Sequence, residues 1–277
     1  MRTVLTIAGS DSSGGAGVQA DLKTFAALGV YGTCAITAVT AQSTTGIVAS
    51  EPLSAEIVTA QLEALAGDIE IHAVKTGMLA TAAVVEAVVA AIEELDLPLV
   101  VVDPVMVSTS GHRLLDADGV QALRLELLPR ARVVTPNIPE AEALSGRRIA
   151  SPADARDAAR RIHDMGARAV IITGGHSVDR ANHQAPVVKP DASDGDIIDV
   201  LLDGDSVHEF RTQRVQPGGH GTGCAFSSAV ATHLALGRPL AEAAERAQRY
   251  VAGAVAHGFA IGRGQRVLNH FWQARSG

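Results

Sequence analysis

Short apolar runs rich in β-branched residues recur along the chain and alternate with longer segments of helical periodicity. Most of the short runs are continuously apolar rather than alternating, which is typical of strands buried on both faces of a parallel sheet. Eight such runs predict strands, at residues 3–8, 34–39, 72–75, 99–103, 133–135, 169–173, 197–202 and 208–215.

The longer segments predict helices between these strands. They cover residues 17–28, 55–66, 82–95, 117–128, 139–144, 152–165, 225–236 and 240–257. Ser54, Thr81 and Ser151 stand where a helix N-cap is expected, and Ser151 precedes a proline at the first helical position. Glycines of the kind that end helices follow three of the segments: Gly29, Gly166 and Gly237.

This alternation predicts a three-layer α/β/α fold around a mostly parallel central sheet. We expect a single domain over residues 1–277, with the polar stretch 177–196 as a surface excursion. Ligands of such folds bind at the carboxyl ends of the strands. The loops at those ends are rich in Gly, Thr, Asp, Asn and Glu: "AGSDSSGGAG", "TAVTAQST", "KTGM", "DPVM", "TPNIPE" and "ITGGH". Their contrast with the apolar strands predicts a binding cleft, although ordinary turn chemistry accounts for any one of them.

Composition narrows the choice of partners. Aromatic residues make up only 3% of the 277 residues, so the core must be built from Ala, Val, Leu and Ile. The net charge is −7 and no Lys/Arg run stands out, which argues against a nucleic-acid partner. No run approaches the roughly 18 apolar residues of a membrane span, so no membrane partner is expected. Cys34 and Cys224 form no disulfide framework and no signal peptide is recognised, so we expect a cytoplasmic location.

The glycine-rich loop at residues 9–17 follows the first strand and opens the first helix. Gly15-x-Gly17-x-x-Ala20 matches the glycine pattern of a dinucleotide-binding loop, but no acidic residue follows the second strand to hold a ribose. It is not a Walker A loop either, because no lysine stands at its end. We therefore expect a close-approach surface for a small ligand, with Asp11 or Asp21 available to bond it. A tight strand-to-helix turn is the alternative.

A second glycine-rich loop, Gly221-Thr222-Gly223-Cys224, leads into a helix whose first N–H groups have no internal partner. The positive end of the helix dipole favours an anion there, and a phosphoryl group in transfer is the natural guest. The same field predicts a lowered thiol pKa, with partial thiolate near neutral pH. Cys224 is then a nucleophile, a general base or a donor in the anion site, and a small buried hydrophobe is the alternative.

Two kinds of cysteine site are excluded by the residues around this loop. The frame around Cys224 lacks the Gly-x-Cys-x-Gly pattern of a hydrolase nucleophile elbow. No Cys-x-x-Cys pair is present to suggest a metal site. We interpret the neighbouring His220 as incidental.

Five segments of the chain together resemble one known family. They are "TIAGSDSSGGAGVQADLKTF", "TAVTAQST", "VVDPVMVSTSGHRLL", "TPNIPEAEALSG" and "HGTGCAFSSAVATHLALG", and the closing "LNHFW" also fits. In this order they resemble the hydroxymethylpyrimidine/phosphomethylpyrimidine kinases of thiamine biosynthesis, in the ribokinase-like superfamily. The resemblance implies an ATP- and Mg²⁺-dependent kinase. Its substrates would be 4-amino-5-hydroxymethyl-2-methylpyrimidine and then the monophosphate, which it converts to the diphosphate.

The resemblance also implies roles for individual residues. Cys224 would be catalytic, since it stands where ribokinase relatives carry an aspartate base, and Gly221, Thr222 and Gly223 would complete the anion hole. The residues implied for the pyrimidine pocket are Gln42, Asp21, Gly9, Met78 and Val105. The residues implied for the nucleotide and its phosphates are Asn137, Glu140, Thr173, Gly175 and His176. Asp103 and Glu140 would position Mg²⁺, largely through water.

The chain departs from the family pattern at a few positions. Thr173 stands where relatives often carry lysine, which removes a candidate phosphate contact, and Ser43 stands where asparagine is usual. A pyridoxal or pyridoxine kinase of the same superfamily is the nearest alternative function. A non-catalytic nucleotide-binding sensor module and a dinucleotide oxidoreductase are further alternatives. A homodimer is an expectation from the family only.

Overall fold

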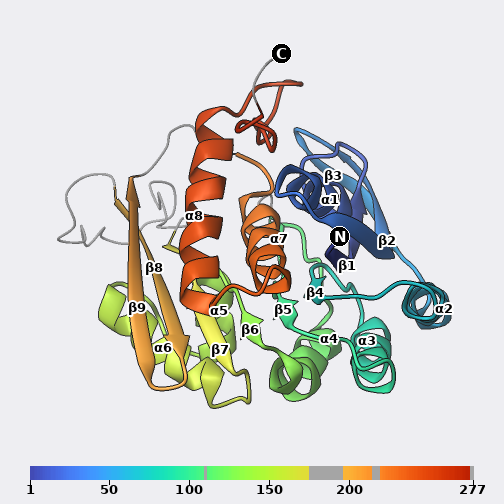
Figure 1. Ribbon diagram of the computed structural model, residues 1–277, viewed down its shortest axis with the longest axis horizontal. Coiled ribbons are helices and arrows are strands. Elements are labelled where there is room, and N and C mark those ends of the chain that lie inside the picture. Colours follow the sequence, from blue (N-terminus) through green and yellow to red (C-terminus); the bar gives the residue numbers. More distant parts are fainter. Residues whose placement is uncertain (109–110, 175–195, 214–218, 275–277) are drawn as a thin grey trace.

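A computed structural model describes residues 1–108, 111–174, 196–213 and 219–274. Nine strands form one sheet in the order β3-β2-β1-β4-β5-β6-β7-β8-β9, with helices on both faces (Figure 1). The strands are β1 (Thr3–Asp11), β2 (Tyr31–Ser43), β3 (Gly46–Pro52), β4 (Ala73–Thr76), β5 (Val100–Val102), β6 (Val133–Val134), β7 (Ala169–Ile172), β8 (Asp196–Asp203) and β9 (Ser206–Gln213).

The interior of the sheet, from β2 to β7, is parallel. The pairs β2/β3, β7/β8 and β8/β9 are antiparallel, so the sheet has antiparallel edges. The prediction of a mostly parallel sheet with helices on both faces is therefore confirmed.

The helices are α1 (Gly17–Ala27), α2 (Ala55–Ala66), α3 (Ala82–Glu94), α4 (Ala117–Ala122), α5 (Ile138–Ser145), α6 (Pro152–His163), α7 (Thr222–Ala235) and α8 (Leu240–Ala256). Among the described helices, none is long and apolar enough to cross a membrane. Ser54, Thr81 and Ser151 cap their helices through the side chain, as predicted. The three predicted terminal glycines have positive φ, at +81° for Gly29, +108° for Gly166 and +79° for Gly237.

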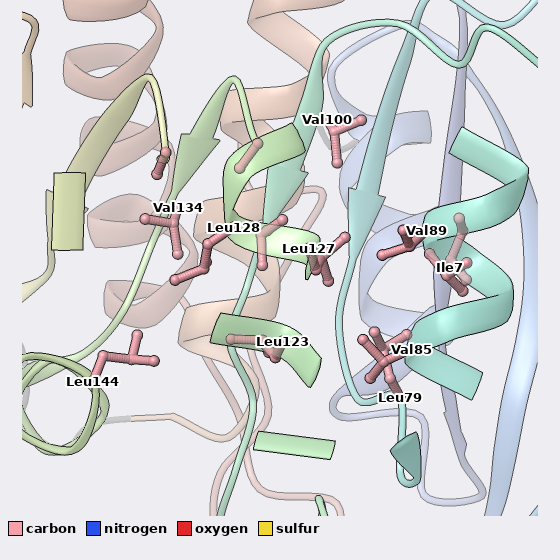
Figure 2. Packing of buried hydrophobic residues seen from close by; sticks show 14 of the residues in the cluster. Ile7, Leu79, Val85, Val89, Val100, Leu123, Leu127, Leu128, Val134 and Leu144 are labelled. Carbon is pink, nitrogen blue, oxygen red and sulfur yellow. The ribbon is translucent and has the colours of Figure 1, made fainter. Parts of the chain in front are cut away.

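Two apolar clusters fill the faces of the sheet. Alternate residues of each central strand point to opposite clusters, so that Leu5 and Ile7 face one and Val4 faces the other. Figure 2 shows members of the first cluster: Val85 and Val89 project from α3, and Leu128 lies beside Val134. The second cluster lies under α1, α7 and α8.

Several predictions of local structure differ from the structure. The strand predicted at residues 34–39 extends over Tyr31–Ser43 as β2, so it includes Gln42. The strand β3 was not predicted, because it is an edge strand with neither face buried, and its apolar stretch Ile47–Ala49 is only three residues long. The helix predicted over 117–128 ends at Ala122 and continues as a π turn (Leu123–Leu127) and a 3₁₀ turn (Leu128–Arg130). Pro129 lacks the N–H that a regular helix would need there. The helix α7 begins at Thr222 and not at residue 225, which places Cys224 inside its first turn. The predicted surface excursion lies outside the described residues except for Asp196.

Candidate active site

A cavity of about 490 Å³ opens at the carboxyl ends of the central strands, where the sequence predicts a cleft. It is lined by the ends of β1, β4 and β5, by the starts of α5 and α7, and by residues of β2 and β3. Most of the predicted site residues line this one cavity: Gly9, Gln42, Met78, Asp103, Val105, Asn137, Glu140, Gly221, Thr222, Gly223 and Cys224. Gly175 and His176 lie outside the described residues.

The two glycine-rich loops, far apart in the sequence, pack directly against each other. Gly221 has φ +86°, and a Cβ atom there would lie 2.0 Å from the carbonyl oxygen of Gly15. A Cβ atom at Gly15 would in turn lie 2.6 Å from the imidazole of His220. Each loop therefore needs glycine at the point where the other approaches, and together they form one wall of the cavity.

Asp11 fixes the shape of the first loop. Its Oδ2 atom accepts hydrogen bonds from the N–H groups of Gly15 at 3.1 Å and Ala16 at 2.8 Å, and its Oδ1 accepts from that of Ser13 at 2.8 Å. Burial opposes ionisation of Asp11, but the contact with His220 and the hydrogen bonds from Ser13 and Ala16 outweigh it and lower the pKa of this carboxyl. Asp11 is thus an ionised carboxylate that binds several backbone N–H groups of the loop.

Cys224 lies in the first turn of α7, and its side chain lines the cavity. Burial raises the pKa of the thiol to about 12, and the charges of Asp21 and Asp103 act in the same direction. The charge of Lys75 and a hydrogen bond from the N–H of Gly17 lower it, but they do not compensate. The predicted partial thiolate is therefore wrong for the protein without ligand, because desolvation outweighs the helix terminus. Both cysteines are free thiols, in agreement with the prediction of no disulfide.

Asp21 corrects a second prediction. It does not line the cavity, because its side chain is fully buried beneath it. Both carboxylate oxygens accept from the ammonium of Lys75, at 3.1 and 2.9 Å, and they also accept from the hydroxyls of Thr6 and Ser228 at 2.6 and 2.7 Å. Thr6 and Lys75 are register partners on β1 and β4, so both point to the face covered by α1 and α7. Asp21 therefore joins the sheet to those two helices.

Lys75 is a site residue that the sequence analysis missed. It lines the cavity, yet its side chain is fully buried. Burial alone would lower the pKa of Lys75, but the negative charge of Asp21, together with that of Asp103, raises it above the usual value for lysine. The sequence does contain a signal for this residue, because a lysine ends the short apolar strand "AVK". A charge is rarely buried without a partner, so a lysine in a buried strand predicts an acidic group beside it.

Two carboxylates lie close together in the cavity: Asp103, whose Oδ2 accepts from the hydroxyl of Ser227 on α7 at 3.1 Å, and Glu140 at the start of α5. Burial raises the pKa of Asp103 to about 6. Burial and then the charge of Asp103 raise the pKa of Glu140 to about 8. Glu140 and Asn137 also form a capping box at the start of α5, with each side chain accepting from the other's backbone N–H at 3.0 Å. A divalent cation would relieve the repulsion between these carboxylates, and Mg²⁺ typically takes one or two carboxylates plus water and phosphate oxygens. Among the described residues, no group of three or more His, Cys, Asp or Glu side chains is placed to hold a metal by itself.

Thr173 does not line the cavity, but it lies next to one of its walls. Its N–H donates to the carbonyl of Pro136 at 3.0 Å, and it pairs with Asn137 in an isolated bridge. The following N–H, of Gly174, donates to the buried carboxylate of Asp199 at 2.7 Å. The described part of this turn is thus fixed beside Asn137, one of the residues that the sequence predicts to bind the nucleotide.

His220, interpreted above as incidental, is also part of the cavity wall. Its Nε2 atom lies 2.9 Å from Nε2 of Gln42 and 3.3 Å from Oδ2 of Asp11. A second hollow of about 430 Å³ adjoins the first and shares Gln42 and His220 with it.

A parallel sheet with a glycine-rich helix N-terminus and facing carboxylates at its carboxyl edge defines a phosphotransferase of the ribokinase-like fold. Solved structures support this class. The pyridoxal kinase of Staphylococcus aureus, in complex with AMP-PCP and pyridoxal, is 35% identical with a TM-score of 0.86, covering 100% of this chain and 96% of that one. The phosphomethylpyrimidine kinase of Clostridium difficile is 38% identical with a TM-score of 0.77, covering 92% and 100%.

Within this class the chain belongs to the phosphomethylpyrimidine kinase family, whose model matches residues 11–269. The hydroxymethylpyrimidine/phosphomethylpyrimidine kinase of Haemophilus influenzae is 43% identical over 278 residues, covering 99% of this chain and 98% of that protein. A thiamine biosynthesis bifunctional protein of Geobacter sulfurreducens is 45% identical over 273 residues. This chain spans only about half of that protein's length, at 53%.

Proposed function

We propose that the chain transfers the γ-phosphoryl group of ATP to the hydroxymethyl group of 4-amino-5-hydroxymethyl-2-methylpyrimidine, and then a second group to the monophosphate, in thiamine biosynthesis. The observation that carries the proposal is the convergence of three groups on one cavity. These are the Cys224 loop at the start of α7, the Asp103–Glu140 carboxylates and the Gln42 amide. The name of the Haemophilus influenzae relative supports the same reaction, and the name of the Geobacter sulfurreducens relative supports a role in thiamine biosynthesis.

In this reaction the alcohol oxygen attacks the γ-phosphorus in line, the bond between the γ-phosphorus and the β,γ-bridging oxygen breaks, and ADP leaves. The alcohol proton passes to an oxygen of the transferred phosphoryl group. Such transfer depends on positioning and charge stabilisation more than on covalent chemistry. Gly221, Thr222 and Gly223 supply the anion hole, and Cys224 lies beside the attacking oxygen. Because its raised pKa keeps the thiol protonated near neutral pH, we favour the role of hydrogen-bond donor over that of base.

Gln42 is proposed to read the pyrimidine, because an amide can match a ring nitrogen and an exocyclic amine together. Gly9, Met78 and Val105 form the rest of that pocket. Thr173, Gly175 and His176 are proposed to lie near the nucleotide. Asp103, Asn137 and Glu140 are proposed to hold Mg²⁺ and the phosphates, and the ion supplies positive charge to the transferring group when bound.

The test is incubation of the purified protein with ATP, Mg²⁺ and either the aminopyrimidine or pyridoxal, followed by mass spectrometry of the products. We expect one and then two phosphoryl groups on the aminopyrimidine. Phosphorylation of pyridoxal alone would establish the alternative activity, which is favoured by the 35% identity to a pyridoxal kinase over the whole chain. No transfer to either compound would contradict the proposal and favour a nucleotide-binding module. We also propose, from the family alone, a homodimer in the cytoplasm.

A further inference from the structure

His220 lies between the two glycine-rich loops and contacts two polar side chains of the cavity wall. Its Nε2 atom is 2.9 Å from Nε2 of Gln42 and 3.3 Å from Oδ2 of Asp11. The imidazole is 17% exposed and the Asp11 side chain only 4%, so water competes little for these contacts. The ring nitrogen is therefore within hydrogen-bonding distance of both groups and can bond to either one.

The Gln42 amide is held at both of its polar atoms. Nε2 faces His220, and Oε1 accepts from the hydroxyl of Thr40 at 3.0 Å. The backbone of Gln42 is fixed separately, because its N–H and its carbonyl each lie 2.8 Å from Oγ of Ser12. A primary amide has two N–H donors and an oxygen that accepts twice, so one N–H and one lone pair remain for a ligand in the cavity.

The orientation of the Gln42 amide depends on whether Nε2 of His220 carries a proton. Nε2 of His220 cannot accept from Gln42 and donate to Asp11 at once. The single hydroxyl proton of Thr40 likewise has two acceptors at 3.0 Å, Oε1 of Gln42 and the carbonyl of Ser10. When the ring nitrogen accepts, the amide lies as the structure has it. When that nitrogen donates to Asp11, the reversed amide is favoured, with its oxygen toward His220 and its N–H toward Thr40.

The two arrangements exchange the donor and the acceptor that a ligand meets. If the hydroxymethyl group must point toward Cys224, the aminopyrimidine cannot turn over to follow a reversed amide. We infer that His220 is a specificity-determining positioning residue. By accepting a hydrogen bond from Gln42, it holds the amide in the orientation that reads an amino group beside a ring nitrogen. The inference rests on the proposed function, because that function identifies the substrate. It adds the residue that determines how the amino group and ring nitrogen of that substrate are recognised.

The imidazole is not needed to hold its own loop. The N–H of His220 donates to the carbonyl of Arg266 at 2.9 Å, and the residue pairs with Val267 in an isolated bridge. Because these bonds are made by the backbone, a change of the side chain leaves them in place. A loss of selectivity in a His220 variant is therefore separable from a loss of the fold.

The experiment compares the aminopyrimidine with an analogue that carries hydrogen in place of the amino group. In His220→Leu, kcat/KM for the amino substrate should fall about five- to tenfold through KM, the size of one hydrogen bond. The values for the analogue and the KM for ATP should change less than about twofold. His220→Gln should keep the preference, because its side-chain oxygen can accept the same hydrogen bond. In a Gln42→Ala background, His220→Leu should cause no further loss, since its effect passes through the amide.

Two results would overturn the inference: an equal loss for both pyrimidines, or additive losses in the double variant. His208→Leu on the edge strand β9 is the matched control, with an exposed histidine far in the sheet order from β1. If the wild-type protein phosphorylates neither pyrimidine, the proposed function fails, and the inference fails with it. If the wild type is active and selectivity is unchanged in His220→Leu, the inference alone fails.

Discussion

Replacing Lys75 by methionine tests whether the buried ion pair between Lys75 and Asp21 stabilises the fold beneath the site. Lys75 and Asp21 are both fully buried, with Nζ 2.9 Å from Oδ2. At an effective dielectric constant of about 20, the attraction at this distance is about 6 kcal/mol. In Lys75→Met, the polar partners that the carboxylate keeps within the described part of the chain are the hydroxyls of Thr6 and Ser228, at 2.6 and 2.7 Å. Removal of one partner from such a pair costs about 3–5 kcal/mol, because the remaining charge is desolvated and uncompensated.

The measurement is the free energy of unfolding from urea titration, together with the melting temperature. A loss of this size should lower Tm by roughly 6–20 °C in a chain of this length. Lys23→Met is the matched control, because Lys23 is exposed and its ammonium donates one exposed hydrogen bond, to the carbonyl of Gly14 at 2.7 Å, so its removal should cost about 1 kcal/mol or less. The double variant Lys75→Met/Asp21→Asn removes both charges and should recover at least half of the loss. A Lys75→Met protein within about 1 kcal/mol of wild type would refute the reasoning, since Asp21 would then not be an isolated buried charge.

Three further predictions concern the site itself. Cys224→Ala should keep the fold and most substrate binding but lower kcat by roughly 10²–10³, and near-normal turnover would reject its catalytic role; Cys224→Asp should retain some activity only if the role is base. Gly221→Ala should lower both Tm and kcat/KM because its Cβ would meet Gly15, whereas Gly237→Ala, with similar φ but open space, should cost only about 1–2 kcal/mol and no activity. The pKa of Glu140 is raised to about 8, so the folded protein binds this proton more tightly than the unfolded chain, and the stability it contributes is lost as pH rises through about 8. Without metal, unfolding free energy should therefore fall by up to about 1.4 kcal/mol per unit between pH 7 and 8, a slope that Glu140→Gln should remove in thermal melts.

The sequence predicts the interior of this fold well, because burial on both faces leaves a continuous apolar signal. Leu5, Val74 and Val101 lie in such runs, and all three are buried in the central strands. This apolar signal is weak in strands that are not buried, and the exposed strand β3 was therefore not predicted. It also fails where proline acts within an apolar helical pattern, as at Pro129.

Prediction of the site follows a similar division. The residues at the ends of the central strands could be placed because the carboxyl ends of parallel strands share one edge of the sheet. The roles of Lys75, His220 and Asp21 depend on partners up to about two hundred positions away, such as Asp11 for His220 and Ser228 for Asp21. No local spacing reports such contacts. Asp21 follows the first glycine-rich loop closely in the sequence, but its carboxylate turns away from the pocket toward the buried ammonium of Lys75.

The protonated state of Cys224 follows from the same surroundings. A helix N-terminus lowers a thiol pKa when it acts alone, but here burial raises it and Asp21 and Asp103 raise it further. An incoming phosphoryl group adds negative charge and strengthens that tendency. An aspartate in this position would also be driven toward its protonated form, while a thiol keeps its proton throughout. Since phosphoryl transfer passes through a loose transition state with little demand for early proton removal, a persistent S–H donor suits the charge that develops on the transferring group.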